Sequence, residues 1–209
     1  MIQFLVDILK YILEFFYSGT NNYGLAIILL VIFIRILLYP LVQAQLKSLL
    51  LMQKIQPEIK KLQEKFKDDP QAFNREVMIL YKQYKINPAM GCLPLLLQFP
   101  ILIALYQLLL HYKYTTIPTF LWISDLTKPD IILLLLMGIT QYFSGKLSSI
   151  STTPEMKKQQ ELNNILMAVL FTGMFYFFNI PAGVMLYWFT SNLFQLLQQF
   201  IVIKLHLGG

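Results

Sequence analysis

Charge is distributed very unevenly along this chain of 209 residues, and that distribution restricts the folds it can adopt. The chain has 17 basic and 11 acidic residues, and 14 of these 28 charges lie between Lys47 and Lys85. Apolar runs dominate the remainder. Only 13% of the residues are charged and 56% are hydrophobic, whereas a soluble domain has about 25% charged residues. The pattern predicts a membrane protein with several spans and excludes a disordered chain.

The apolar runs predict five transmembrane helices, because about 20 apolar residues cross the ~30 Å hydrocarbon core of a bilayer. The expected boundaries are residues 23–42, 92–110, 130–147, 162–178 and 183–205. The third and fourth segments are short, which suggests a thinned bilayer or tilted neighbours. The expected fold class is therefore an all-α membrane protein, with residues 1–209 forming a single domain.

Two further segments carry charge at helical spacing. In residues 1–17 the three charged side chains fall on one helical face. This pattern predicts an amphipathic helix that lies in the membrane interface or packs against the bundle. In residues 47–87 apolar positions recur at helical intervals on both sides of Pro70, which predicts a helical hairpin outside the bilayer.

The basic residues also predict the orientation of the chain. Residues 47–85 contain nine basic and five acidic residues, a net charge of +4. With five spans, this segment lies on the same side as Lys157, Lys158 and Lys204. Cytoplasmic loops carry an excess of Lys and Arg. We therefore expect the hairpin and the C-terminus in the cytoplasm and the N-terminus outside.

Arg35 is the one charged residue well inside a predicted span. Its burial costs ~2.5–3.5 kcal/mol on insertion scales, and apart from Asp130, the first residue of the third predicted span, the spans contain no Asp or Glu. Arg35 could line a water-containing cavity that opens to one side. Alternatively it could bind helix carbonyls or extend to the interface, since Val42 is seven residues away, roughly 10 Å along a helix. Polar side chains of other spans that could hydrate it are Gln98, Gln107, Thr140, Gln141, Ser144, Thr172, Asn192 and Gln195.

The sequence gives little support to catalysis or metal binding. Its two histidines, His111 and His206, are far apart, and neither an HExxH motif nor a Walker A loop is present. The single cysteine, Cys92, cannot form an internal disulfide. We therefore expect no enzyme activity, metal or cofactor. An anion channel or transporter that uses Arg35 is one alternative, and a purely structural assembly factor is another.

A positive charge in a closed-ended cavity also suits a different role. It would attract an acidic or polar segment that must cross the membrane, while neighbouring apolar residues pass into lipid. Low local dielectric strengthens that attraction. Burial of apolar residues in the bilayer would drive the process without a nucleotide.

Three segments resemble the YidC/Oxa-type membrane protein insertases. They are RILLYPL at residues 35–41, INPAMGCLPLLLQFPILIALYQLL at 86–109 and IPAGVMLYWFTSNLFQLLQ at 180–198. The resemblance covers the whole chain, with spans and hairpin in the same order. It implies a monomeric insertase or chaperone of the bacterial cytoplasmic membrane, with a hydrophilic groove that is closed outward and open to the cytoplasm and the lipid.

The resemblance also assigns roles to individual residues. Arg35, Gln141 and Trp188 match groove positions that engage the hydrophilic segment of a client. Phe99, Pro100, Tyr176 and Phe177 match positions of an apolar slide for the client helix, although plain helix packing would also explain them. The implied partners are nascent membrane proteins, the lipid bilayer and the Sec translocon. The basic hairpin could also bind ribosomal or signal-recognition components, although a solvated helical pair without a specific partner would equally explain its charges.

Overall fold

The structure is a computed structural model that describes residues 2–87, 93–147 and 154–207. Its helices are α1 (Ile2–Thr20), α2 (Tyr23–Lys65), α3 (Pro70–Gln83), α4 (Leu93–His111), α5 (Ile131–Leu147), α6 (Pro154–Phe177) and α7 (Ala182–Leu207). The described residues contain no other regular element, only an isolated bridge between Phe120 and Ile123. The all-α prediction is therefore confirmed.

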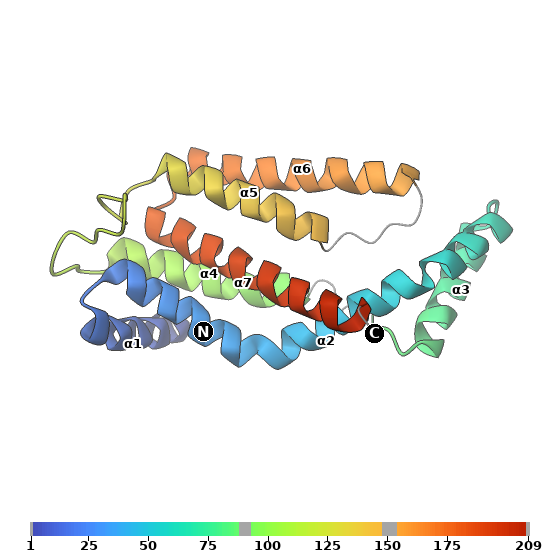
Figure 1. The fold of residues 1–209 in the computed structure, drawn as a ribbon, viewed down its shortest axis with the longest axis horizontal. Helices are drawn as coiled ribbons and strands as arrows, with labels where there is room; N and C mark the ends of the chain where they lie inside the picture. Colours follow the sequence, from blue (N-terminus) through green and yellow to red (C-terminus); the bar gives the residue numbers. More distant parts are fainter. Residues whose placement is uncertain (1, 88–92, 148–153, 208–209) are drawn as a thin grey trace.

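Helix α2 is 43 residues long and joins two segments that the sequence analysis treats separately, the first predicted span and the start of the charged segment. The side chain of Asn22 caps its first turn by accepting a hydrogen bond from the Leu25 amide at 3.0 Å. Pro40 and Pro57 lie inside the helix, which bends along its length as proline-containing helices do (Figure 1).

In the described part of the chain, α2 alone combines the length and apolar character needed to cross a membrane. Residues 96–111 of α4 and all of α5 are shorter apolar helices. Helix α6 begins eight residues before the predicted fourth span, and α1 continues three residues past its predicted end. Cys92, the first residue of the predicted second span, lies outside the described residues. The number of spans stays a prediction.

Helices α1, α2, α4, α5, α6 and α7 form the bundle, and the C-terminal half of α2 projects from it together with α3 (Figure 1). Helix α7 is central, because residues 182–188 at its start are all buried and the helix contacts α2, α4 and α5. Small residues allow α5 and α6 to approach closely. A side chain at Gly138 would place its Cβ 2.6 Å from Thr172 Oγ1, so glycine permits this contact.

The projecting part, which we call the α2–α3 arm (residues 47–87), has a small apolar core of its own. This core contains Ile55, Leu80 and Ile86. The carboxylate of Asp69 caps α3, and Tyr84 Oη donates a 2.6 Å hydrogen bond to Glu58 Oε1 across the two helices. The arm is therefore held by its own contacts.

The opposite end of the bundle, which we call the loop end, contains residues 112–130 and the turns between α1 and α2 and between α6 and α7. Backbone hydrogen bonds of 2.8 Å join Gly183 to the Leu126 carbonyl and Ala182 to the Lys128 carbonyl. The ring of Tyr23, at the start of α2, packs edge-to-face against Tyr114 with centroids 4.9 Å apart. These contacts tie together three connections that are distant in sequence.

Candidate functional site

Arg35 lies half-buried on α2 and reaches α7. Its Nη2 donates a 2.8 Å hydrogen bond to the backbone carbonyl of Ser191. A guanidinium has five N–H donors, and this is its one hydrogen bond to the described part of the chain. The two ion pairs found among the described residues do not involve it. Within the described part of the chain, the charge is thus held in place but not paired with an acidic side chain.

A small cavity adjoins Arg35 between α2 and α4. Its lining residues are Arg35, Leu38, Leu41, Val42, Gln45, Leu97 and Gln98. The volume of this cavity is about 30 Å³, which is room for about two water molecules. The sequence allows Arg35 either to line a cavity or to bind a helix carbonyl. In the structure it does both.

Gln141 and Trp188 meet between α5 and α7. The indole Nε1 of Trp188 donates to Gln141 Oε1 at 3.2 Å, and Nδ2 of Asn192 donates to the same oxygen at 3.0 Å. Trp188 and Asn192 are 8% and 6% exposed. One amide oxygen therefore satisfies two buried donors, which fixes the Gln141 side chain against α7.

Residues 187–192 of α7 connect the three predicted groove positions. Arg35 binds this segment at Ser191, while Gln141 binds it at Trp188 and Asn192. On the α4 side, Gln98 Nε2 donates a 3.0 Å hydrogen bond to Tyr187 Oη. A polar segment therefore runs along α7 inside an otherwise apolar bundle.

The four predicted slide positions do not form one patch. Phe99 is 48% exposed, Tyr176 is 59% exposed and Phe177 is 80% exposed, while Pro100 is half-buried. Helices α4 and α6 both end at the loop end of the bundle (Figure 1). Phe99 and Pro100 lie near the start of α4, whereas Tyr176 and Phe177 lie in the last turn of α6. The two pairs therefore lie at different heights along the bundle.

The structure adds two residues that the sequence analysis does not single out, Ser191 and Tyr187. Ser191 acts through its carbonyl oxygen, a group that every residue has, so no side-chain pattern reveals it. Tyr187 is 1% exposed and carries a hydroxyl, and buried tyrosine hydroxyls usually have a partner. That rule is the one signal that could have identified it.

Comparison with known proteins now identifies the family. The model of the 60Kd inner membrane protein family matches residues 15–207. The chain belongs to this family. The membrane protein insertase YidC of Clostridium tetani, a curated relative, is 40% identical over 205 residues, which are 98% of this chain and 92% of that protein. The resemblance to YidC/Oxa-type insertases is thus confirmed.

Other relatives from this family are longer. The membrane protein insertase YidC of Geotalea daltonii is 41% identical over 92% of this chain, and that of Syntrophobacter fumaroxidans is 40% identical over 95%. The chain spans only 36% and 38% of their respective lengths.

A solved structure also matches the fold. It is described as an active YidC insertase crystal structure with the first transmembrane domain resolved. The match has a TM-score of 0.71 at 30% identity and covers 93% of this chain and 46% of that one. The all-helical fold of the chain is therefore similar to that of this solved structure.

Proposed function

We propose that this chain inserts proteins into the bacterial cytoplasmic membrane. A short hydrophilic segment of the client enters a groove that contains Arg35, Gln141 and Trp188, and the client's apolar helix leaves into the bilayer. Membership of the 60Kd inner membrane protein family and the names of its relatives support an insertase. The observation that carries the mechanism is Arg35, a charge beside a cavity that is held in place without an acidic partner among the described residues.

The positive charge of Arg35 attracts a client segment most strongly when that segment carries a negative charge. Two unit charges 4 Å apart attract by about 1 kcal/mol in water and about 4 kcal/mol at an effective dielectric constant of 20. The four guanidinium N–H groups that Ser191 leaves available can bind a client carboxylate. Burial of the client's apolar residues in lipid then drives insertion without a nucleotide.

The cavity must widen before a client can enter, because about 30 Å³ holds water but not a peptide segment. The Gln98–Tyr187 hydrogen bond joins α4 to α7 at this cavity. We therefore include separation of α4 from α7 as the opening step. The ties at the loop end support an opening at the opposite, cytoplasmic end.

The proposal includes the membrane arrangement expected from the sequence. The chain crosses the bilayer five times as a monomer, with the N-terminus outside and the C-terminus and the α2–α3 arm in the cytoplasm. The arm has a net charge of +4 between residues 47 and 85 and provides a surface for ribosomal or signal-recognition components. The chain acts alone or beside the Sec translocon. Phe99 and Pro100 contact the client helix near the cytoplasm, and Tyr176 and Phe177 contact it near the loop end.

The test uses the purified chain in liposomes and two single-span clients that differ only in their translocated segment, one acidic and one neutral. Protease protection measures the insertion rate. Arg35→Ala is expected to slow the acidic client at least fivefold and the neutral client less than twofold. Arg35→Lys keeps the charge and is expected to retain most of the rate.

Lys128→Ala removes a positive charge at the loop end and serves as the matched control, with thermal unfolding of every variant as the check on folding. Equal slowing of both clients by Arg35→Ala would contradict the electrostatic role. Equal impairment by Lys and Ala would instead show that Arg35 acts by packing the spans together. Absence of insertion by the folded wild-type chain would refute the function itself.

A further inference from the structure

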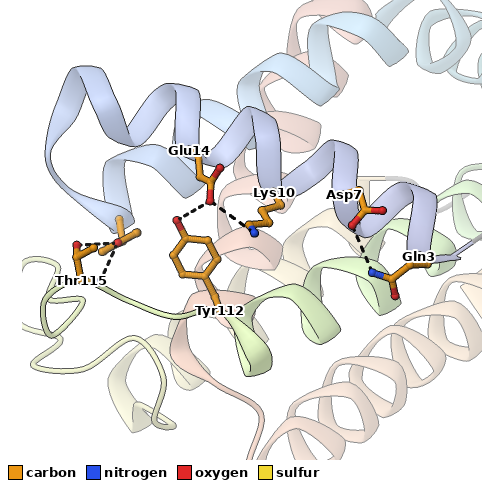
Figure 2. Close-up of polar contacts among 7 residues, drawn as sticks. Gln3, Asp7, Lys10, Glu14, Tyr112 and Thr115 are labelled. Atoms are coloured by element: carbon orange, nitrogen blue, oxygen red, sulfur yellow. Dashed lines mark hydrogen bonds and ion pairs between the residues drawn. The ribbon is translucent and has the colours of Figure 1, made fainter.

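A second polar pocket lies between α1 and the end of α4, apart from the site around Arg35. Its volume is about 490 Å³, within the usual range of small-molecule pockets. The polar lining residues are Gln3, Asp7, Lys10 and Glu14 of α1, with Gln107, His111, Tyr112 and Lys113 at the end of α4. Figure 2 shows the α1 side chains in a row facing α4, with Tyr112 reaching toward Glu14.

Helix α1 has three faces, and together they place this pocket at a membrane surface. Leu9 and Leu13 are buried in the bundle core. The polar row lines the pocket. The third face exposes Phe4, Tyr11 and Phe15, which are 68%, 76% and 67% exposed. A line of exposed aromatic residues beside a polar row is typical of a helix in the interface, where one face meets acyl chains and the other meets headgroups. We therefore expect the pocket to open at headgroup level.

The charges in the pocket balance and are only loosely paired. Asp7 and Glu14 oppose Lys10 and Lys113. Lys10 Nζ lies 3.9 Å from Glu14 Oε1, and Tyr112 Oη donates to the same oxygen at 3.4 Å. Lys113 forms no ion pair with the described residues. Exposed pairs of this kind contribute only ~0–1 kcal/mol, so a ligand can replace them at little cost.

The balance of charge selects the ligand class. A simple anion would be repelled by the two carboxylates, and a simple cation would be repelled by the two lysines. A ligand with a phosphate and a primary ammonium group satisfies both sets, because the ammonium has three N–H donors for carboxylates. Val6 and Leu108 add apolar surface to the lining, which suits the adjoining glycerol and methylene groups.

We propose that this pocket binds the phosphoethanolamine headgroup of a membrane phospholipid. The ammonium lies by Asp7 and Glu14, and the phosphate lies by Lys10 and Lys113. The acyl chains then extend along the exposed aromatic face of α1. This inference depends on the membrane location of the chain and not on its insertase activity, so the two proposals can fail separately.

Native mass spectrometry of the full chain in detergent tests this proposal. The ligands are short-chain phosphatidylethanolamine, phosphatidylcholine and phosphatidylglycerol, with free glycerophosphoethanolamine and inorganic phosphate as soluble probes. Phosphatidylethanolamine is expected to bind at least fivefold more tightly than any of the others. The double variant Asp7→Asn/Glu14→Gln and the variant Lys113→Gln are each expected to weaken it at least fivefold.

Glu161→Gln and Lys128→Gln neutralise charges outside the pocket and are the matched controls, expected to bind like the wild type. Phosphatidylcholine binding equal to that of phosphatidylethanolamine would overturn the proposal, because its quaternary ammonium cannot donate hydrogen bonds. Preference for phosphatidylglycerol or phosphate would indicate an anion site instead. Equally tight binding of glycerophosphoethanolamine would indicate a soluble ligand rather than a lipid. Unchanged binding by the variants would place the lipid elsewhere.

Discussion

The hydrogen bond from Gln98 to Tyr187 offers a direct test of how the cavity beside Arg35 opens. Tyr187→Phe removes the accepting hydroxyl and keeps the ring, so packing around this side chain, which is 1% exposed, is preserved. If the bond closes the cavity by holding α4 against α7, its loss favours the open state. The free-energy difference between the closed and open states then changes by the net free energy of one hydrogen bond.

That free energy is ~0.5–1.5 kcal/mol, which corresponds to a change of about 2- to 13-fold in the open fraction. Water in the cavity can replace the lost partner of Gln98, so the lower part of this range is expected. The readout is the rate at which a charged, membrane-impermeant maleimide modifies a cysteine placed at Gln45, which lines the cavity. The native Cys92 is replaced by serine throughout.

Tyr187→Phe is expected to raise the modification rate about 2- to 13-fold. Tyr176→Phe, which alters an exposed tyrosine on α6, is the matched control and is expected to leave the rate unchanged. An unchanged or lower rate in Tyr187→Phe, with unfolding as in the wild type, would refute the reasoning. The cavity would then open by movement of some other pair of helices.

Two further predictions concern stability. Gln141→Leu leaves the buried donors of Trp188 and Asn192 without their acceptor, which costs ~1–3 kcal/mol; thermal unfolding should show a clearly lower Tm, and an unchanged Tm would contradict this. Burial opposes ionisation of Asp125, but hydrogen bonds from the Thr127 amide and hydroxyl and the nearby Lys128 hold the pKa of Asp125 below its ordinary 3.8. The contribution of ionised Asp125 to the stability of the fold is therefore present above pH 3.8 and is lost as the pH falls through the lower pKa that Asp125 has in the folded protein. Asp125→Asn should flatten the dependence of Tm on pH below about 4 and leave insertion unchanged.

Arg35, Gln141 and Trp188 illustrate how much of the site the sequence predicts. A charge inside an apolar run is visible without a structure because lipid makes it costly, so Arg35 stands out. Gln141 and Trp188 are assigned by resemblance, and the structure joins Gln141 to Trp188, which lies within residues 187–192 of α7. The acceptor for Arg35 is a backbone carbonyl, and backbone groups leave no trace in a side-chain pattern.

The limits of the fold prediction have a similar physical origin. Hydropathy indicates where a chain passes from lipid to water, but it does not indicate where a helix ends. The sequence therefore becomes polar after Val42 although helix α2 continues to Lys65. The polar row of α1 is predicted from its spacing, but its position facing α4 depends on which neighbour packs beside it. The small size of the cavity at Arg35 depends on packing details that periodicity does not contain.

The continuity of α2 has a consequence for how the length of this segment can vary. Arg35 and Ile55 lie on one helix, so they keep a fixed angular relation as well as a fixed distance. Each residue inserted between Val42 and Ile55 turns the α2–α3 arm by about 100° and moves it by about 1.5 Å. An insertion of seven residues restores the direction to within about 20°. Length changes in this part of the helix therefore decide which side of the arm faces a partner at the membrane surface.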